Sequence, residues 1–207
     1  MSERARPRSP LAMVVLVLLS EDPMHPYRMQ QLIKSRRKDD VVNVARSNSI
    51  YQTIDRLLRD GLIEVQEKRM ADLGPGRIVY GLTEEGKRTV ERWINTMLAS
   101  PAREFPEFRA VLAMVAGTDP GVVREQLERR AAALAATLAQ LEEEMRQAGQ
   151  FGLPRVLVLE NEYAIVVTRA ELRWVEQVVA DLGSGELAWS VDQLDELRRK
   201  HEPNLDA

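Results

Sequence analysis

The stretch that decides the fold is SIYQTIDRLLRDGLIEVQEKRMADLGPGRIVYGLTEEGKRTVERW, residues 49–93. It opens with apolar residues at the three- and four-residue spacing of an amphipathic helix, and Gly61 is a typical residue to end that helix. The pattern then changes to two short strands, 62–68 and 77–82, joined by the turn-rich loop 71–76. Thr83 follows as the N-cap of another helix, with two glutamates in its first turn. The stretch therefore predicts a helix, a β-hairpin and a second helix.

Two further helices are predicted upstream. Ser9 and Pro10 are the N-cap and first residue expected at a helix start, and the apolar run that follows predicts a buried helix up to Asp22-Pro23. Pro26 to about Lys38 is expected to form an amphipathic helix, and Ser47 or Asn48 is expected to cap the helix after it. The inward positions predicted for these two helices are Tyr27, Met29, Leu32 and Ile33, then Ile50, Ile54, Leu57 and Leu58. After the hairpin the expected apolar positions are Val90, Trp93, Ile94, Met97 and Leu98.

Composition and charge narrow the class of protein. The 207 residues contain no Cys and two His, so a disulfide, a thiolate metal site or a His-assisted nucleophile is not expected, and we predict no catalytic site, metal or cofactor. The first hundred residues carry a net charge of +4 and the remainder −7, which favours a polyanion-binding unit joined to a unit with another role.

The arginines at 4, 6 and 8 before the apolar run 11–19 imitate a signal peptide. However, the run leads into Ser20-Glu21-Asp22-Pro23 rather than into small residues suited to cleavage, and nine apolar residues are too few to cross a bilayer. A cytoplasmic protein is expected. The arginine tail is either a phosphate-binding arm or an inert extension.

The second half predicts two long helices. Asp119-Pro120 opens one, and a break at 149–154 is followed by another from Pro154 to about Leu182. The first has apolar residues that alternate at spacings of four and three, which is typical of a coiled-coil seam: Leu127, Ala131, Leu134, Leu138, Leu141, Met145 and Ala148. The second has Val156, Leu159, Tyr163, Val167, Ala170, Trp174, Val178 and Leu182 along one side. An antiparallel pair of such helices would leave apolar surface uncovered, and a second subunit is the expected cover.

Three helices, a hairpin and a fourth helix are the order of a winged helix-turn-helix domain. The strings PMHPYRMQQLI (23–33), SIYQTIDRLLRDGLIEV (49–65) and RIVYGLTEEGKRTVERW (77–93) resemble the PadR family of transcriptional regulators. The chain departs from that family's pattern at Pro26, where Gly is usual, at Ile54, where Leu is usual, and at Gly81 after the wing tyrosine. The resemblance implies a homodimeric repressor with a helical C-terminal dimerisation region, and some members sense small aromatic or cationic molecules.

The expected fold is therefore mainly α with a small β-hairpin. Residues 1–100 would form the winged helix-turn-helix DNA-binding domain, and residues 101–207 an antiparallel, coiled-coil-like dimerisation and effector domain. Residues 105–116 could form a short helix that docks on either half, and the role of a last helix around 187–200 stays open. Winged helices also serve as protein-interaction modules, and that alternative predicts no salt-sensitive DNA binding.

In the DNA-binding hypothesis the third helix enters the major groove with its early residues against base edges. Its outward positions are Ser47, Asn48, Ser49, Tyr51, Gln52, Asp55 and Arg56. Asn48 and Gln52 can pair with adenine, Arg56 can reach guanine or phosphate, and Ser49 and Tyr51 suit phosphates, although Tyr51 could instead pack. Tyr27 and Arg28 at the second helix, with Lys68, Arg69 and Arg77 at the wing tip, complete the expected DNA contacts.

The expected dimerisation residues lie on the two long helices. They are Leu127, Leu134, Leu138, Leu141, Met145, Tyr163, Val167, Trp174 and Val178. Among the aromatic residues, Trp93 is the best candidate for a ligand pocket, against the alternative that it is an ordinary core residue. The expected partners are double-stranded DNA, a second copy of the chain and a small-molecule effector, with no membrane.

Overall fold

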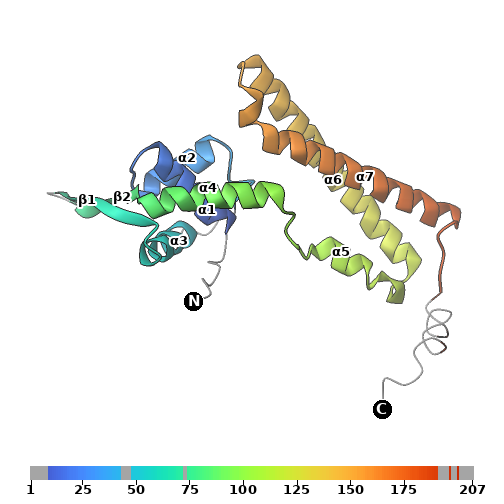
Figure 1. The fold of residues 1–207 in the computed structure, drawn as a ribbon. Coiled ribbons are helices and arrows are strands. Elements are labelled where there is room, and N and C mark those ends of the chain that lie inside the picture. Colours follow the sequence, from blue (N-terminus) through green and yellow to red (C-terminus); the bar gives the residue numbers. More distant parts are fainter. Residues whose placement is uncertain (1–8, 43–47, 72–73, 191–195, 197–199, 201–207) are drawn as a thin grey trace, which may run out of the picture. The chain divides into compact units, whose positions relative to one another are not determined.

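The computed structural model describes residues 9–42, 48–71, 74–190, 196 and 200, and the chain divides into two compact units, Met1–Arg103 and Glu104–Ala207 (Figure 1). The predicted tail 1–8, Ser47 and most of the expected last helix lie outside the described residues. None of the helices within these ranges combines the length and apolar character that a membrane crossing requires.

The first unit begins with α1 (Pro10–Glu21), which is buried on several sides as its all-apolar sequence predicts. Ser9 caps it by accepting a hydrogen bond from the Ala12 N–H at 3.4 Å. Arg36, just after α2 (Pro26–Ser35), donates hydrogen bonds of 2.6 and 2.7 Å to the Glu21 carboxylate and so links the ends of the two helices.

The predicted end of α2 near Lys38 is wrong. Arg37 adopts a left-handed conformation, with a φ of 53°, directly after the helix. The Lys38 N–H then donates to the Ile33 carbonyl at 2.8 Å and the Arg37 N–H to the Lys34 carbonyl at 2.9 Å, which is the Schellman arrangement that usually has glycine at the left-handed position. An arginine there gives no sequence signal for a helix end.

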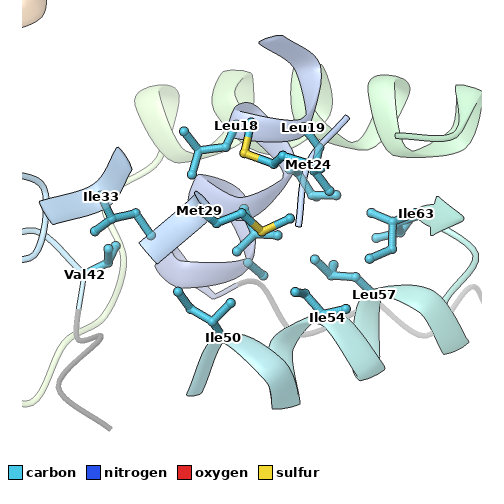
Figure 2. Close-up of a cluster of buried hydrophobic side chains, with 14 of the residues drawn as sticks. Leu18, Leu19, Met24, Met29, Ile33, Val42, Ile50, Ile54, Leu57 and Ile63 are labelled. Carbon is cyan, nitrogen blue, oxygen red and sulfur yellow. The ribbon is translucent and has the colours of Figure 1, made fainter. Parts of the chain in front are cut away.

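The third helix, α3 (Asn48–Arg59), packs Ile50, Ile54 and Leu57 into the core as predicted (Figure 2). Leu58 was expected to face inward but is exposed, because it lies beyond the edge of the buried stripe. Gly61, with a φ of 68°, ends α3 in a second Schellman arrangement, in which the Leu62 N–H donates to the Leu57 carbonyl at 3.0 Å.

The hairpin strands β1 (Ile63–Ala71) and β2 (Gly74–Leu82) are antiparallel and longer than predicted. The pairing runs from Ile63 opposite Leu82 to Ala71 opposite Gly74, with irregularities between Val65 and Glu67 and between Arg69 and Ala71. Met24, just before α2, adds an antiparallel bridge to Tyr80, with hydrogen bonds of 3.0 and 3.1 Å. The base of the hairpin is therefore fixed to the start of α2.

The fourth helix, α4 (Glu84–Ala99), begins at Thr83 as predicted. The Thr83 hydroxyl donates to the Gly61 carbonyl at 2.8 Å and accepts from the Gly86 N–H at 3.0 Å, while the Thr83 N–H donates to the Leu62 carbonyl at 3.1 Å. One residue thus joins the end of α3, the start of β1 and the start of α4. Of the predicted apolar positions, Trp93 is buried, whereas Ile94, Met97 and Leu98 are exposed because they lie off the buried face of α4.

The second unit contains α5 (Glu107–Leu112), a 3₁₀ turn η1 (Val115–Gly117), α6 (Pro120–Gln150), a second turn η2 (Arg155–Leu157) and α7 (Leu159–Ser184). The long helices α6 and α7 pack side by side as an antiparallel hairpin (Figure 1). The predicted start of the last long helix at Pro154 is wrong, since Pro154 opens η2 and α7 begins only at Leu159.

The core of the second unit forms around Val123 and Leu127 of α6 and Val175 of α7. Phe108 of α5 packs against this cluster, edge to face with the Trp174 ring at a centroid distance of 6.1 Å. The Arg130 guanidinium lies over the Phe108 ring, 3.5 Å from its centroid, and also donates a hydrogen bond to Glu171 at 2.8 Å. The segment that could have docked on either half therefore packs, through Phe108, within the second unit.

Candidate nucleic-acid interface

The outward face of α3 is polar and is held rigidly by its buried face. Ile50, Ile54 and Leu57 are at most 1% exposed, whereas Tyr51 is 47% exposed and Gln52 is also exposed. Thr53 is buried, and its hydroxyl donates to the Ser49 carbonyl at 2.8 Å, which fixes the first turns. The helix thus presents a regular row of polar side chains on a backbone that the core immobilises.

The start of α2 borders the same surface. The His25 Nδ1 accepts a hydrogen bond from the Tyr27 N–H at 3.1 Å, so the histidine acts as the N-cap of α2. Arg28 is exposed beside it. Tyr27 was predicted both to pack inward and to contact DNA, and its inward placement is wrong: at 59% exposed it projects from the first turn, where no core element covers it.

A groove connects these elements. It lies between the start of α2, Tyr51 of α3 and the base of the hairpin, and Tyr27, Arg28, Tyr51, Gln66 and Tyr80 are among the residues that line it. Its walls combine aromatic rings with amide and guanidinium groups, which can bind sugar and phosphate as well as base edges. The structure therefore brings Tyr27, Arg28 and Tyr51 together, as the DNA-binding hypothesis requires.

Two lining residues, Gln66 and Tyr80, were not among the sequence-predicted site residues. Gln66 lies at the irregular step between Val65 and Glu67, and its side chain covers Gly81, where an added Cβ would come within 2.7 Å of the Gln66 Cγ. Gln66 is exposed, and its side chain would have to move away to admit a larger residue at position 81. The alternation of inward and outward residues along β1 is the one sequence signal that could have placed Gln66 in the groove. The bulge at this residue interrupts that alternation.

Electrostatics place a carboxylate close to the groove. Burial raises the pKa of Tyr80 above its usual value, and the nearby charges of Asp55 and then Tyr51 raise it further. Asp55 also follows Tyr51 by four residues, so it lies on the same side of α3 as this groove-lining tyrosine.

The remaining predicted site residues fall in different places. Ser49 and Arg56 are partly exposed on α3, and only the backbone is described for Asn48, Lys68, Arg69 and Arg77. Arg69 pairs with Arg77 across the strands near the hairpin tip. Trp93, the pocket candidate, is 6% exposed and packs in the core of the first unit. No group of His, Asp and Glu within the described ranges is placed to hold a metal ion.

Residues 15–92, which span α1 to α4, match the model of the transcriptional regulator PadR-like family. Residues 107–183 match a second model, the virulence activator alpha C-terminal domain. Residues 15–92 of the chain therefore form a PadR-like domain. This family is defined as one of transcriptional regulators and is not a class of enzymes.

Solved structures share the fold of this PadR-like chain. Bacillus subtilis PadR in complex with operator DNA is 17% identical, with a TM-score of 0.66 over 83% of this chain and 98% of that chain. The same protein with p-coumaric acid is 18% identical, with a TM-score of 0.67 over 84% and 99%. The Vibrio cholerae virulence activator AphA is 20% identical, with a TM-score of 0.65 over 84% and 98%. A search of the curated proteins found no match.

The predicted dimerisation residues of this PadR-like chain separate into three groups. Leu127, Leu134 and Val178 belong to the core of the second unit and pack between α6 and α7. Three more seam residues of α6 are partly exposed, namely Leu138, Leu141 and Met145. Tyr163, Val167 and Trp174 are exposed on α7, whereas Val178 and Leu182 of the same predicted stripe pack with Val175, which is fully buried.

Proposed function

We propose that this PadR-like chain is a homodimeric, sequence-specific DNA-binding repressor whose α3 reads the major groove of a palindromic operator. The observation that carries the proposal is the exposed polar face of α3, held on a buried stripe and bordered by the groove at α2 and the hairpin. The shared fold of Bacillus subtilis PadR, which was solved with operator DNA, supports the same use of this unit.

The residues of α3 divide by chemistry. Asn48 and Gln52 carry amides that can pair with an adenine edge, and Arg56 can bind guanine or a phosphate. Ser49 and Tyr51 are suited to phosphate contacts that fix the position of the helix.

The other contacts would supply affinity that does not depend on sequence. Tyr27 and Arg28 border the groove, and Lys68, Arg69 and Arg77 lie along the distal part of the hairpin. Each neutralised phosphate releases counterions, so affinity is expected to fall steeply with salt, with a slope of about −0.9 per contact.

The second unit would hold two reading helices together. The uncovered stripe of α7 includes Leu159, Tyr163, Val166, Val167 and Trp174, with Tyr163 72% exposed. A continuous apolar surface of this kind marks a protein interface, and a second copy that buries the same stripe gives a closed, two-fold dimer. Two half-sites would then lie about 34 Å apart, one turn of DNA.

A small molecule could release the operator. Bacillus subtilis PadR was solved with p-coumaric acid, which supports a small aromatic effector in this fold. Such a ligand acts only if it binds the DNA-free state more tightly than the DNA-bound state, because equal affinity shifts no population.

DNA binding is tested by fluorescence anisotropy of the full-length protein with a duplex from upstream of its own gene and a scrambled duplex, at several salt concentrations. We expect selective binding that weakens with salt and that is reduced by Gln52→Ala and by Arg56→Ala. Arg88→Ala on α4 removes the same charge from an exposed site and serves as the matched control. Binding that is absent at low salt would instead favour a winged-helix protein-interaction module.

Assembly is tested by sedimentation of the wild type and of Tyr163→Glu, which places a charge on the α7 stripe. Gln126→Glu introduces the same charge at an exposed position of α6 and is the control. We expect the stripe variant to dissociate at concentrations at which the wild type and the control are dimers. An unchanged sedimentation coefficient would show that another surface joins the subunits.

A further inference from the structure

Asp55 is an acidic residue on the face proposed to meet DNA, and it is the only carboxylate in α3. It is exposed and lies three residues after Gln52 and four after Tyr51, on the same face of the helix. Arg59 follows one turn later, where an ion pair could form. Within the part of the chain that the structure describes, the Asp55 carboxylate nevertheless makes no hydrogen bond or ion pair.

The position of Asp55 beside the groove follows from its neighbours. Its charge acts on the hydroxyl of Tyr80, and both Tyr80 and Tyr51 line the groove. The carboxylate thus lies beside the groove rather than on a face directed away from it. If α3 enters the major groove, Asp55 enters with it.

A carboxylate in that place discriminates strongly between groups on DNA. Phosphates repel it, as do the acceptor atoms O6 and N7 of guanine and O4 of thymine. Cytosine offers its N4 amino group as a donor in the major groove with no acceptor beside it on the same base, and carboxylates accept from that group, whereas the N6 donor of adenine lies beside the acceptor N7. An unpaired carboxylate therefore lowers the affinity for non-specific DNA and favours cytosine. Its specificity comes both from the hydrogen bond to this base and from repulsion by acceptor groups on the others.

The spacing indicates where that base lies. Three residues of α-helix advance by about 4.5 Å, close to the rise of about 3.4 Å per base pair. The base that faces Asp55 should therefore be next to, or one step beyond, the base that faces Gln52.

We infer that Asp55 is a specificity-determining residue that selects cytosine at one position of each operator half-site by accepting a hydrogen bond from its N4 amino group. This inference rests on the proposed function, because it requires α3 to enter the major groove. It adds a base preference that Asn48, Gln52 and Arg56 do not supply.

The test is random-sequence selection with the full-length wild type, Asp55→Asn, Asp55→Ala and Glu91→Gln. Glu91 is an exposed carboxylate on α4, so its substitution removes the same charge outside α3. The wild type and Glu91→Gln should enrich the same motif, with cytosine at one position per half-site. Asp55→Ala should lose the preference there only, and Asp55→Asn should shift it toward adenine, which an amide can pair with.

A second measurement needs no variant. N4-methylcytosine at the selected position keeps its pairing with guanine but places a methyl group where the free amino hydrogen would meet the carboxylate. Wild-type affinity should fall by about tenfold, while the affinity of Asp55→Ala should stay the same.

The outcomes separate the two ideas. If the wild type enriches a motif and both Asp55 variants enrich the same one, the inference is wrong and the proposed function stands. If N4-methylation leaves wild-type affinity unchanged, the inference is equally overturned. If the wild type enriches no motif at all, the proposed function fails and this inference fails with it.

Discussion

Replacement of Gly86 by alanine should destabilise the first unit, although alanine favours a helix. Gly86 lies in the first turn of α4, where a Cβ would come within 2.7 Å of Leu82 Cδ1 and closer still to the Leu62 carbonyl oxygen. That oxygen accepts the Thr83 N–H and belongs to backbone that cannot rotate away. The start of α4 must therefore move off β1.

The magnitude follows from three contributions. Alanine gains about 1 kcal/mol of helix propensity over glycine. Overpacking in a fixed site costs about 1–3 kcal/mol, and a weakened Thr83 cap with its backbone bond adds about 1–2 kcal/mol. The net expectation is a loss of about 1–4 kcal/mol in the free energy of unfolding of the first unit.

Urea unfolding followed by circular dichroism, together with hydrogen exchange of peptides from α4, reads this unit separately from the second. Gly149→Ala is the control, because Gly149 lies in α6 and its Cβ would meet nothing within 4 Å. That variant should gain up to about 1 kcal/mol. A Gly86→Ala protein as stable as the wild type would refute the packing argument.

Further expectations concern caps, charge and the second unit. Arg37→Gly should raise the unfolding free energy by up to about 1 kcal/mol and Gly61→Ala should lower it by a similar amount, because both positions have positive φ; urea midpoints with unchanged slopes would check this. The Arg36 hydrogen bonds lower the pKa of Glu21, so the pair stabilises the fold above the ordinary glutamate pKa of about 4.3 and the contribution is lost as the pH falls through the lower folded value. For this exposed pair we expect about 0.5 kcal/mol, measured as the stability difference between wild type and Arg36→Gln at neutral pH that vanishes in acid; a difference that persists there would contradict it. Phe108→Leu should speed hydrogen exchange in α5 while α4 is unaffected, because the ring contacts that hold α5 are lost; equal exchange would show that other contacts hold it.

Local signals in the sequence predicted much of the fold. Ser9, Thr83 and Gly61 each have a side chain or a conformational freedom that suits one backbone geometry, so their roles as caps could be inferred without tertiary contacts. Arg37 could not be, because the surrounding contacts impose its left-handed conformation against its own preference. The length of the hairpin also escaped prediction, since its bulge at Gln66 interrupts the alternation that marks a strand.

The sequence predicts those interface residues whose exposure follows from helix periodicity. It does not predict those whose place depends on contacts between distant parts of the chain. The outward order of Tyr51 and Gln52 follows from helix geometry alone once Ile50 and Ile54 are known to be inside. Tyr80 could not be assigned to the groove, because its place depends on the bridge to Met24, which pairs residues far apart in sequence.

The helix α7 shows why periodicity cannot identify a partner. Its sequence has apolar residues on two faces, and either face could pack inside the hairpin. In the structure Val175 fills the interior, and Tyr163 and Trp174 remain at the surface, so the chain has more apolar surface than α6 can cover. The second apolar face of α7 makes the buried face ambiguous in the sequence, and it is the surface that a second copy of the chain would bury. Reading of DNA by α3 and assembly through α7 would then reside in separate units. A substitution on α3 should impair DNA binding and leave assembly intact, whereas a substitution on α7 should impair assembly, and operator affinity with it, without unfolding the first unit.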